Sequence, residues 1–245
     1  MIAYLTSTLG CSCLEDGKWK TRGIDESNGL AEEIRKVWKP GGRCCILSAD
    51  PKAWEMNDSI CNQFAESIVL TGMDAGEVCI CDSRNSSQVM EQLDSYDVLV
   101  LFGGHVPTQN AFFQQIGLKE KIADFDGLLL GISAGTMNSA GLVYAQPELQ
   151  GESTDPSYVR FMNGLGLMDF MVIPHFQAWR EERLDGKRIL EEITYPDSMG
   201  RQFYALCDGS YILLEGARRL LCGEAYLIKD GTLRKICETG EKKEL

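Results

Sequence analysis

The sequence is poor in the residues that metal and nucleic-acid sites need. Only two histidines occur among the 245 residues. None of the ten cysteines forms a Cys-x-x-Cys pair, so the ligands of a zinc site are scarce. There is no long basic run, and 24 Lys and Arg against 36 Asp and Glu give a formal net charge of −12. Because ligands are scarce, we expect no metal cofactor. Because an acidic surface repels a phosphate backbone, we also expect no nucleic-acid partner.

The sequence also lacks a segment that is typical of a membrane anchor. Its longest uncharged stretch, residues 127–147, contains four glycines together with serine, asparagine and glutamine, which argues against a bilayer helix. The apolar run at the N-terminus is short and has no basic region before it, unlike a secretory or lipoprotein signal. We therefore expect a cytoplasmic protein that does not use a membrane, with its cysteines reduced.

The overall composition is typical of a globular protein. Hydrophobic residues make up 44% and charged residues 24% of the chain, which excludes a disordered chain or a fibre. The length suits one large domain or two small ones. Because no linker, repeat or low-complexity segment divides the sequence, we expect a single domain over residues 1–245.

Short apolar runs alternate with longer runs of helical period. Strand-like runs lie at residues 2–7, 44–48, 77–81, 98–102 and 128–132, and helical runs at 30–39, 55–70, 86–93 and 108–122. This alternation predicts an α/β three-layer sandwich, with a mostly parallel central sheet and helices on both faces. Beyond it, the pattern predicts a helix over 184–193 and then short strands joined by Gly or Asp-Gly turns, in an antiparallel C-terminal edge.

The clearest chemical motif is Gly131-Ile-Ser133-Ala-Gly135. It follows the apolar run 128–132 and precedes small residues, which is the strand–turn–helix setting of a G-x-S-x-G nucleophile elbow. Small neighbours leave room for a serine on a sharp turn, and the N-terminus of the following helix faces a developing oxyanion. Ser133 is therefore the candidate nucleophile, with a helix-capping serine as the plainer alternative.

Both histidines also follow predicted strands. His105 comes after Phe102-Gly103-Gly104, and His175 comes after an apolar run at residues 171–173. Because strand carboxyl ends meet at one crevice in an open α/β sheet, either imidazole can serve as the base. The paired glycines predict an oxyanion loop, since backbone N–H groups approach a substrate closely where no Cβ intervenes.

The polar stretch 147–156 supplies candidates for the acid that orients the histidine. They are Glu148, Glu152 and Asp155, and each is otherwise a solvated loop charge. A carboxylate in this role holds the imidazole tautomer and stabilises the imidazolium that forms. The residues alone do not choose among the three.

Three blocks of sequence together resemble the peptidase E family of serine peptidases, the dipeptidase E and cyanophycinase group. They are FGGHVPTQ at 102–109, GISAG at 131–135 and GLGLMDFMVIPHF at 164–176. Their order and approximate separation fit the family, and the resemblance extends from about residue 44 to residue 216. It implies a class I glutamine-amidotransferase-like α/β fold.

The resemblance implies a role for each matching residue. Ser133 would be the nucleophile and His175 the general base, while the backbone N–H groups of Gly104 and Ala134 would form the oxyanion hole. The substrate-binding candidates are Gly103, His105, Arg180 and Arg183. The two arginines are candidates for the cation that an N-terminal aspartate of the substrate needs.

The resemblance also bears on the acid. Counting forward from Ser133 without gaps points to Glu148. Glu152 is the alternative, because this chain is longer than the dipeptidase pattern between that position and residue 164. The family's usual Asn after the paired glycines is His105 here, and Pro107 is extra. Both departures leave the substrate preference open.

The expected activity is hydrolysis of short peptides, above all dipeptides with an N-terminal aspartate, through an acyl-enzyme and without a cofactor. An α/β-hydrolase esterase is disfavoured, because its histidine normally lies near the C-terminus and 70 residues follow His175. A glutamine amidotransferase would have Cys in place of Ser133. The alternative outside catalysis is a protein that binds a small acidic metabolite in the same crevice. The expected partner is a small peptide, and a homodimer is compatible with the sequence.

Overall fold

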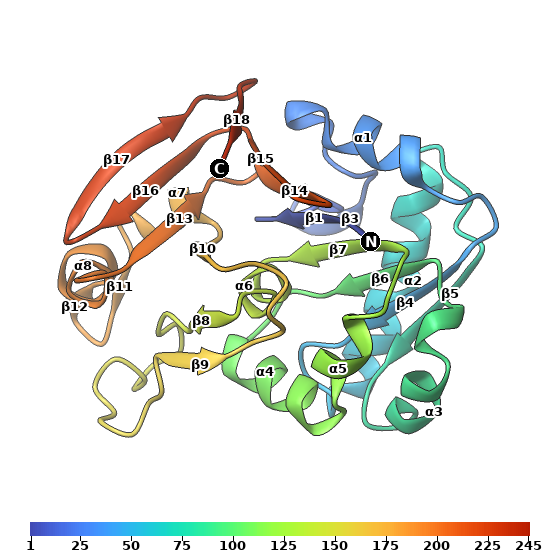
Figure 1. The fold of residues 1–245 in the computed structure, drawn as a ribbon, viewed down its shortest axis with the longest axis horizontal. Helices are drawn as coiled ribbons and strands as arrows, with labels where there is room; N and C mark the ends of the chain where they lie inside the picture. The colour runs from blue at the N-terminus through green and yellow to red at the C-terminus, as the bar shows by residue number, and fades with distance from the viewer.

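The computed structural model describes all 245 residues, and its centre is an eight-stranded sheet (Figure 1). In spatial order the strands are β18 (Lys242–Glu244), β15 (Arg218–Cys222), β14 (Tyr211–Glu215), β1 (Ile2–Thr6), β7 (Leu128–Ile132), β6 (Val98–Leu101), β4 (Arg43–Leu47) and β5 (Glu77–Cys81). The strands from β1 to β5 in this order are parallel, and β14, β15 and β18 are antiparallel to their neighbours. The predicted parallel sheet and its antiparallel C-terminal edge are confirmed.

Helices cover both faces of this sheet. On one face lie α1 (Leu30–Val37), which follows the short η1 (Ser27–Gly29), and α2 (Trp54–Leu70). On the other face lie α3 (Ser86–Glu91), η2 (Leu93–Ser95), α4 (Val106–Gln115), α5 (Leu118–Ile122) and α6 (Ala134–Asn138). Apolar side chains of the central strands pack against helices on each side, which explains their continuous apolar sequence. The predicted helix 108–122 is two helices, because Gly117 takes a left-handed backbone (φ 63°) between them.

A second, smaller sheet stands beside the first (Figure 1). Its order is β10 (Met171–Ile173), β13 (Gln202–Leu206), β16 (Ala225–Lys229) and β17 (Thr232–Cys237), and β10 runs parallel to β13. It has its own core, in which the Tyr144 and Phe203 rings stack at 4.4 Å. β8 (Leu142–Tyr144) and β9 (Phe161–Asn163) pair beside it, and α7 (Phe176–Trp179) follows β10. The C-terminal strands are therefore divided between two sheets.

The helix predicted over residues 184–193 is wrong in its first half. The chain forms a hairpin there, β11 (Arg183–Leu184) and β12 (Lys187–Arg188), whose turn Asp185-Gly186 has positive φ at both residues. That is a type I′ turn, which is typical of tight hairpins. A π-helical segment, η3 (Ile189–Thr194), and the short α8 (Tyr195–Asp197) follow.

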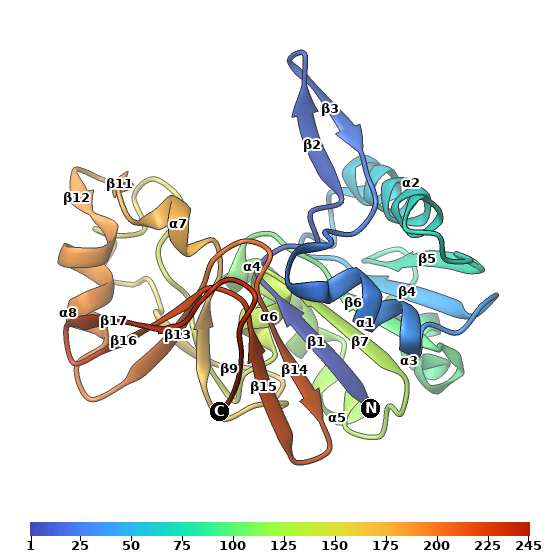
Figure 2. The same cartoon turned by 90° about the horizontal axis from the view of Figure 1, so that it is seen from above.

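A third two-stranded sheet, which is a hairpin, projects from the body of the molecule (Figure 2). It consists of β2 (Ser12–Glu15) and β3 (Lys18–Thr21), joined by Asp16-Gly17, again with positive φ at both residues. None of the helices combines the length and apolar character needed to cross a membrane. All ten cysteines are free thiols, and no group of three or more His, Cys, Asp or Glu side chains is placed to hold a metal ion.

Candidate active site

Ser133 lies on a sharp turn between β7 and α6, at the carboxyl ends of the parallel strands. Its backbone has φ 50° and ψ −111°, a conformation that is strained for a residue with a side chain. The Ser133 N–H donates to the Thr6 carbonyl of the neighbouring strand (3.1 Å), which holds the turn in place. A Cβ on Gly135 would lie 2.0 Å from the Leu101 carbonyl oxygen, so only glycine fits there. These are the features of a nucleophile elbow.

His175 brings its imidazole to this serine from the second sheet. It follows β10 and has a left-handed backbone (φ 54°, ψ 34°), from which α7 begins. Its Nε2 lies 3.0 Å from Ser133 Oγ, within hydrogen-bond distance. Its backbone N–H donates to Ser7 Oγ (2.7 Å), which lies just beyond β1 of the central sheet. Of the two histidines, His175 is thus the one that meets Ser133.

The carboxylate on the far side of the imidazole is Asp208. Its Oδ1 lies 2.7 Å from His175 Nδ1 and accepts a second hydrogen bond, also 2.7 Å, from Ser7 Oγ. Gln177 donates to its Oδ2 at 2.5 Å, and the Asp208 N–H donates back to Gln177 Oε1 at 3.0 Å. Ser133, His175 and Asp208 therefore form one line of hydrogen bonds, in the order hydroxyl, imidazole and carboxylate that a serine-hydrolase triad requires.

The environment of Asp208 keeps it ionised. Partial burial raises its pKa, but hydrogen bonds from His175, Ser7 and Gln177 outweigh this effect, and the net pKa lies below its ordinary value. An ionised carboxylate only accepts hydrogen bonds, so the proton of a neutral His175 resides on Nδ1. Nε2 is then free to accept the Ser133 hydroxyl proton.

The prediction that Glu148 or Glu152 contacts this histidine is wrong. Glu152 Oε1 lies 2.8 Å from His105 Nε2, and its Oε2 accepts the N–H groups of Glu148 and Leu149, both at 2.9 Å. Asp155 accepts hydrogen bonds only from Ser157, in a turn of its own loop. Glu152 and Asp155 are thus engaged elsewhere, and Glu148 makes no hydrogen bond to His175. The loop that carries them is tied to the start of α4 through Glu152 and to the β11–β12 hairpin through Asp185.

A rule used for Ser133 could have found Asp208. Parallel strands present the residues after their carboxyl ends at one edge of a sheet. β10 and β13 are parallel neighbours, with Ile173 opposite Ala205, so His175 and Asp208 both follow strand ends that lie side by side. In the sequence, Asp208-Gly209 follows the apolar run Phe203–Leu206, which is the position of a residue just after a strand. To place Asp208 beside His175, one must also know that β10 pairs with β13, and these strands lie about thirty residues apart in sequence.

Glu148 lies close to the site in a different role. Burial raises the pKa of its carboxyl, while the charges of His105 and His175 lower it and that of Glu152 raises it further, and the net pKa is above its ordinary value. The carboxyl is thus half-buried within electrostatic reach of both imidazoles. Without a positive partner, such a group resists ionisation.

His105 is occupied by contacts of its own. It occupies the position before the first residue of α4. Its Nδ1 lies 2.7 Å from Thr108 Oγ1, and its Nε2 lies 2.8 Å from Glu152 Oε1. This pair ties the loop that carries Glu148 to the residue directly after the paired glycines. His105 borders the site without contacting Ser133 or His175.

The paired glycines lie against the nucleophile. A Cβ on Gly103 would be 3.3 Å from Ser133 Cβ, and one on Gly104 would be 2.5 Å from Ala49 Cβ. The Gly104 N–H makes no hydrogen bond within the protein. Ala134 is the first residue of α6, where a backbone N–H has no acceptor inside the helix. Two N–H groups beside Ser133 are thus available to an incoming oxygen.

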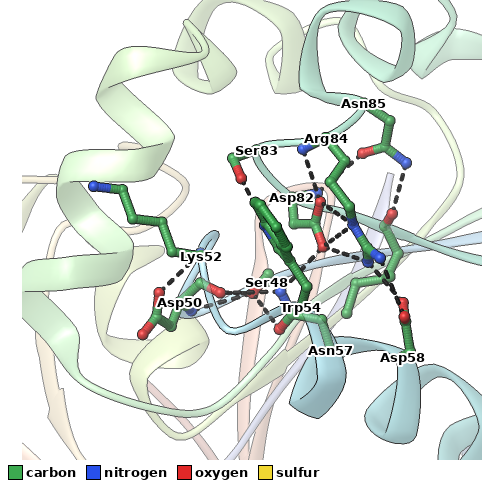
Figure 3. Close-up of polar contacts among 11 residues, drawn as sticks. Ser48, Asp50, Lys52, Trp54, Asn57, Asp58, Asp82, Ser83, Arg84 and Asn85 are labelled. Carbon is green, nitrogen blue, oxygen red and sulfur yellow. Dashed lines mark hydrogen bonds and ion pairs between the residues drawn. The ribbon is translucent and has the colours of Figure 1, made fainter.

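Ala49, the residue under Gly104, lies between two residues of a polar network, Ser48 and Asp50. Figure 3 shows this network. Asp82, after β5, is fully buried and pairs with Arg84 (2.7 Å), which also pairs with Asp58 (2.6 Å). Asp82 accepts a hydrogen bond from Asn57 (3.1 Å), whose amide bonds the Ser48 hydroxyl and the Asp50 carbonyl on either side of Ala49. The turn below the glycines is thereby fixed from the ends of β4 and β5.

The two arginines that were expected to bind substrate lie on the second-sheet side. The Arg180 guanidinium sits over the rings of Phe176 and Tyr226, 5.9 and 6.0 Å from their centroids. Arg183 is exposed at the β11–β12 hairpin and donates to the Gly186 carbonyl at 3.2 Å. Neither forms a hydrogen bond or ion pair with Ser133, His175 or Asp208.

No model of a known protein family matches the sequence, and a sequence comparison with curated proteins also gives no match. Among solved structures, one that matches is a "Putative Peptidase E Protein" from Listeria monocytogenes EGD-e. The TM-score is 0.57 at 14% identity, and the match covers 96% of this chain and 98% of that one. The chain has a peptidase E-like fold.

Proposed function

We propose that this protein is a serine peptidase that hydrolyses short peptides through an acyl-enzyme. The observation that carries the proposal is the line of hydrogen bonds from Ser133 Oγ to His175 Nε2 (3.0 Å) and from His175 Nδ1 to Asp208 (2.7 Å). It is supported by the strained backbone of Ser133, since such strain persists where the surrounding structure holds a functional group in place. A helix-capping serine would need neither the histidine nor the acid.

In the proposed reaction, Ser133 Oγ attacks the peptide carbonyl carbon while its proton passes to His175 Nε2. The N–H groups of Gly104 and Ala134 donate to the carbonyl oxygen as it becomes negative. When the C–N bond breaks, the imidazolium gives its proton to the leaving amine, and the acyl group stays on Ser133. Water then attacks the ester with His175 as base, which releases the acid and restores the hydroxyl. Asp208 stabilises the imidazolium during both formation and hydrolysis of the acyl-enzyme.

A short substrate with a free amino terminus suits the position of Glu148. Its half-buried carboxyl lacks a hydrogen-bonded cation and has a raised pKa, and an ammonium group beside it would favour the ionised form. We therefore propose that the Glu148 carboxylate binds the ammonium group of the substrate. The preference for an N-terminal aspartate stays a prediction from the family resemblance, with Arg180 and Arg183 as the cations that would serve it.

The test combines turnover with active-site labelling. Wild type, Ser133→Ala and Ser87→Ala, an exposed serine on α3, are assayed on a panel of Asp-Xaa, Glu-Xaa and neutral dipeptides. We expect hydrolysis by wild type and Ser87→Ala. Loss of the nucleophile should reduce kcat by about 10⁶-fold, as in other enzymes with this triad. A fluorophosphonate probe should modify Ser133 in the two active proteins.

Two outcomes would contradict the proposal. Turnover by Ser133→Ala at the wild-type rate would exclude this serine as nucleophile. Absence of both hydrolysis and labelling in wild type would favour the alternative of a protein that binds a small acidic metabolite in the same crevice. Binding of such a metabolite by Ser133→Ala, measured by calorimetry, would then support that alternative.

A further inference from the structure

A small cavity of about 110 Å³ lies on the α1–α2 face of the central sheet, at the carboxyl ends of its strands. Its apolar walls are Leu9, Ile60, Phe64, Phe102 and Ile132. The larger hollows of the surface, of about 790 and 600 Å³, are lined by other residues. Ser133, His175 and Asp208 do not line this cavity either, but it differs from those hollows because direct chain neighbours of the candidate active site line it.

Three of its lining residues are chain neighbours of the candidate active site. Ile132 directly precedes Ser133, Phe102 directly precedes Gly103, and Thr8 directly follows Ser7. These neighbours are held together by the sheet, since Thr6 is opposite Ile132 in the β1–β7 pair. The cavity thus lies next to Ser133, to the paired glycines and to Ser7, which accepts the His175 N–H.

The cavity has no charged side chain in its lining. Its polar groups are hydroxyls and one amide, among them Thr8 and Gln63, and its one ionisable group is the Cys11 thiol. Burial raises the pKa of Cys11 to about 11, so the thiol is neutral near pH 7. A carboxylate or ammonium placed here would lose hydration without gaining a charged partner, which is unfavourable.

We propose that this cavity is the side-chain pocket of the enzyme and that it takes an uncharged aliphatic side chain, no larger than that of leucine, from a residue flanking the scissile bond. The inference rests on the proposed peptidase function. An apolar cavity of about 150 Å³ binds benzene, so a space of about 110 Å³ suits a smaller group. Arg180 lies over rings of the second sheet and is not in the lining. Arg22, whose charge lowers the pKa of the Cys11 thiol, is not in the lining either, so an acidic side chain finds no cation among the residues that form the cavity.

The test is a matrix of dipeptides in which one position is Ala and the other is Ala, Val, Leu, Trp, Asp or Lys. For wild type, we expect kcat/KM at one of the two positions to favour Val and Leu over Trp, Asp and Lys by at least tenfold. Gln63→Lys adds a cation to the lining, so preference at that same position should shift toward Asp. Asn62 is the exposed residue of α2 directly before Gln63, and Asn62→Lys makes the same charge change outside the cavity, so it should leave the preference unaltered.

A second variant guards against misfolding of the first. Ile60→Trp fills the cavity, and it should reduce kcat/KM for the leucine substrate more than for the alanine substrate. Preference for Asp at both positions in wild type would contradict the pocket proposal, and so would an unchanged preference in Gln63→Lys and Ile60→Trp. Hydrolysis and labelling of Ser133 in the same experiments would still support the peptidase proposal. Absence of hydrolysis and labelling would overturn both.

Discussion

The two halves of the candidate site come from two parts of the fold that differ in how they hold their residues. Ser133 and the paired glycines follow β7 and β6, strands of the central sheet that are buried between two layers of helices. His175 and Asp208 follow β10 and β13 of the small sheet, and their side chains are 32% and 41% exposed. Ser133 is thus fixed by a core, while His175 and Asp208 are fixed by hydrogen bonds at a partly open surface.

One residue joins the two halves. The Ser7 hydroxyl lies beyond the end of β1 in the central sheet, donates to Asp208 and accepts the His175 backbone N–H. A further backbone bond runs from the Ser7 N–H to the Ser210 carbonyl (3.2 Å), just beyond Asp208. Alignment of the base with the nucleophile therefore depends on contacts between the sheets, and variants on either side should separate the two contributions.

Removal of the acid should have the largest effect on the small-sheet half. Asp208→Asn keeps the shape of the side chain but favours the wrong imidazole tautomer, and we expect kcat to fall by about 10⁴-fold with the fold intact. The measurement is kcat on the best dipeptide together with the rate of labelling at Ser133. Circular dichroism checks that the variant is folded.

The control for this experiment is the pair of carboxylates that the structure assigns elsewhere. Glu152→Gln and Asp155→Asn should each change kcat by less than about tenfold, because neither carboxylate contacts His175. A loss in Glu152→Gln as large as that in Asp208→Asn would mean that the loop carrying Glu152 rearranges to supply the acid.

Loss of the joining hydroxyl should have an intermediate effect. Ser7→Ala removes a hydrogen bond to a charged carboxylate, a type of bond worth about 1.5–3 kcal/mol, and we expect kcat to fall by about 10–100-fold with little change in KM. Ser7→Thr keeps a hydroxyl and should recover part of this loss. Ser210→Ala removes a neighbouring buried hydroxyl that bonds the Glu224 carbonyl and should leave kcat unchanged. Equal kcat in Ser7→Ala and wild type would remove Ser7 as a positioning residue.

The same contrast explains which parts of the site could be predicted from sequence. Ser133 lies in a local pattern, because the strand, the tight turn and the small residues of α6 are contiguous in the chain. The central sheet could be predicted for the same reason, because the strands and helices of each βαβ unit are close together in the sequence. His175 could be named as one of two candidates, and its contact with Ser133 is a property of the fold.

Asp208 could not be named from a local pattern. Its place depends on the parallel pairing of β10 with β13, and the intervening chain forms a hairpin and η3 before returning. The division of the last strands between two sheets is likewise non-local, because β14 pairs with β1 at the other end of the sequence. The hairpins at Asp16-Gly17 and Asp185-Gly186 are different: their turn signal is local, and the helical spacing of apolar residues at 184–193 obscured the second.

The smallest expected effect on catalysis concerns the network below the paired glycines. Burial raises the pKa of Asp82, but hydrogen bonds from Arg84 and Asn57 outweigh this effect and the net pKa is lowered. A lowered folded-state pKa adds to the free energy of unfolding above the ordinary Asp pKa of about 4, and this contribution is lost as the pH falls through the folded-state value.

Asp82→Asn should therefore lower Tm by about 3–10 °C at pH 7, and the gap from wild type should narrow as the pH falls below about 4, toward the lowered folded-state pKa of Asp82. Because Asp82 reaches the paired glycines only through Asn57 and Ala49, kcat should fall by less than about tenfold. Asp94→Asn, an exposed carboxylate on η2, is the matched control and should change neither quantity. A Tm gap that stayed constant with pH would show that the Asp82 charge is not what stabilises the turn, and a loss of kcat equal to that in Asp208→Asn would make this network, and not the small sheet, the more demanding half of the site.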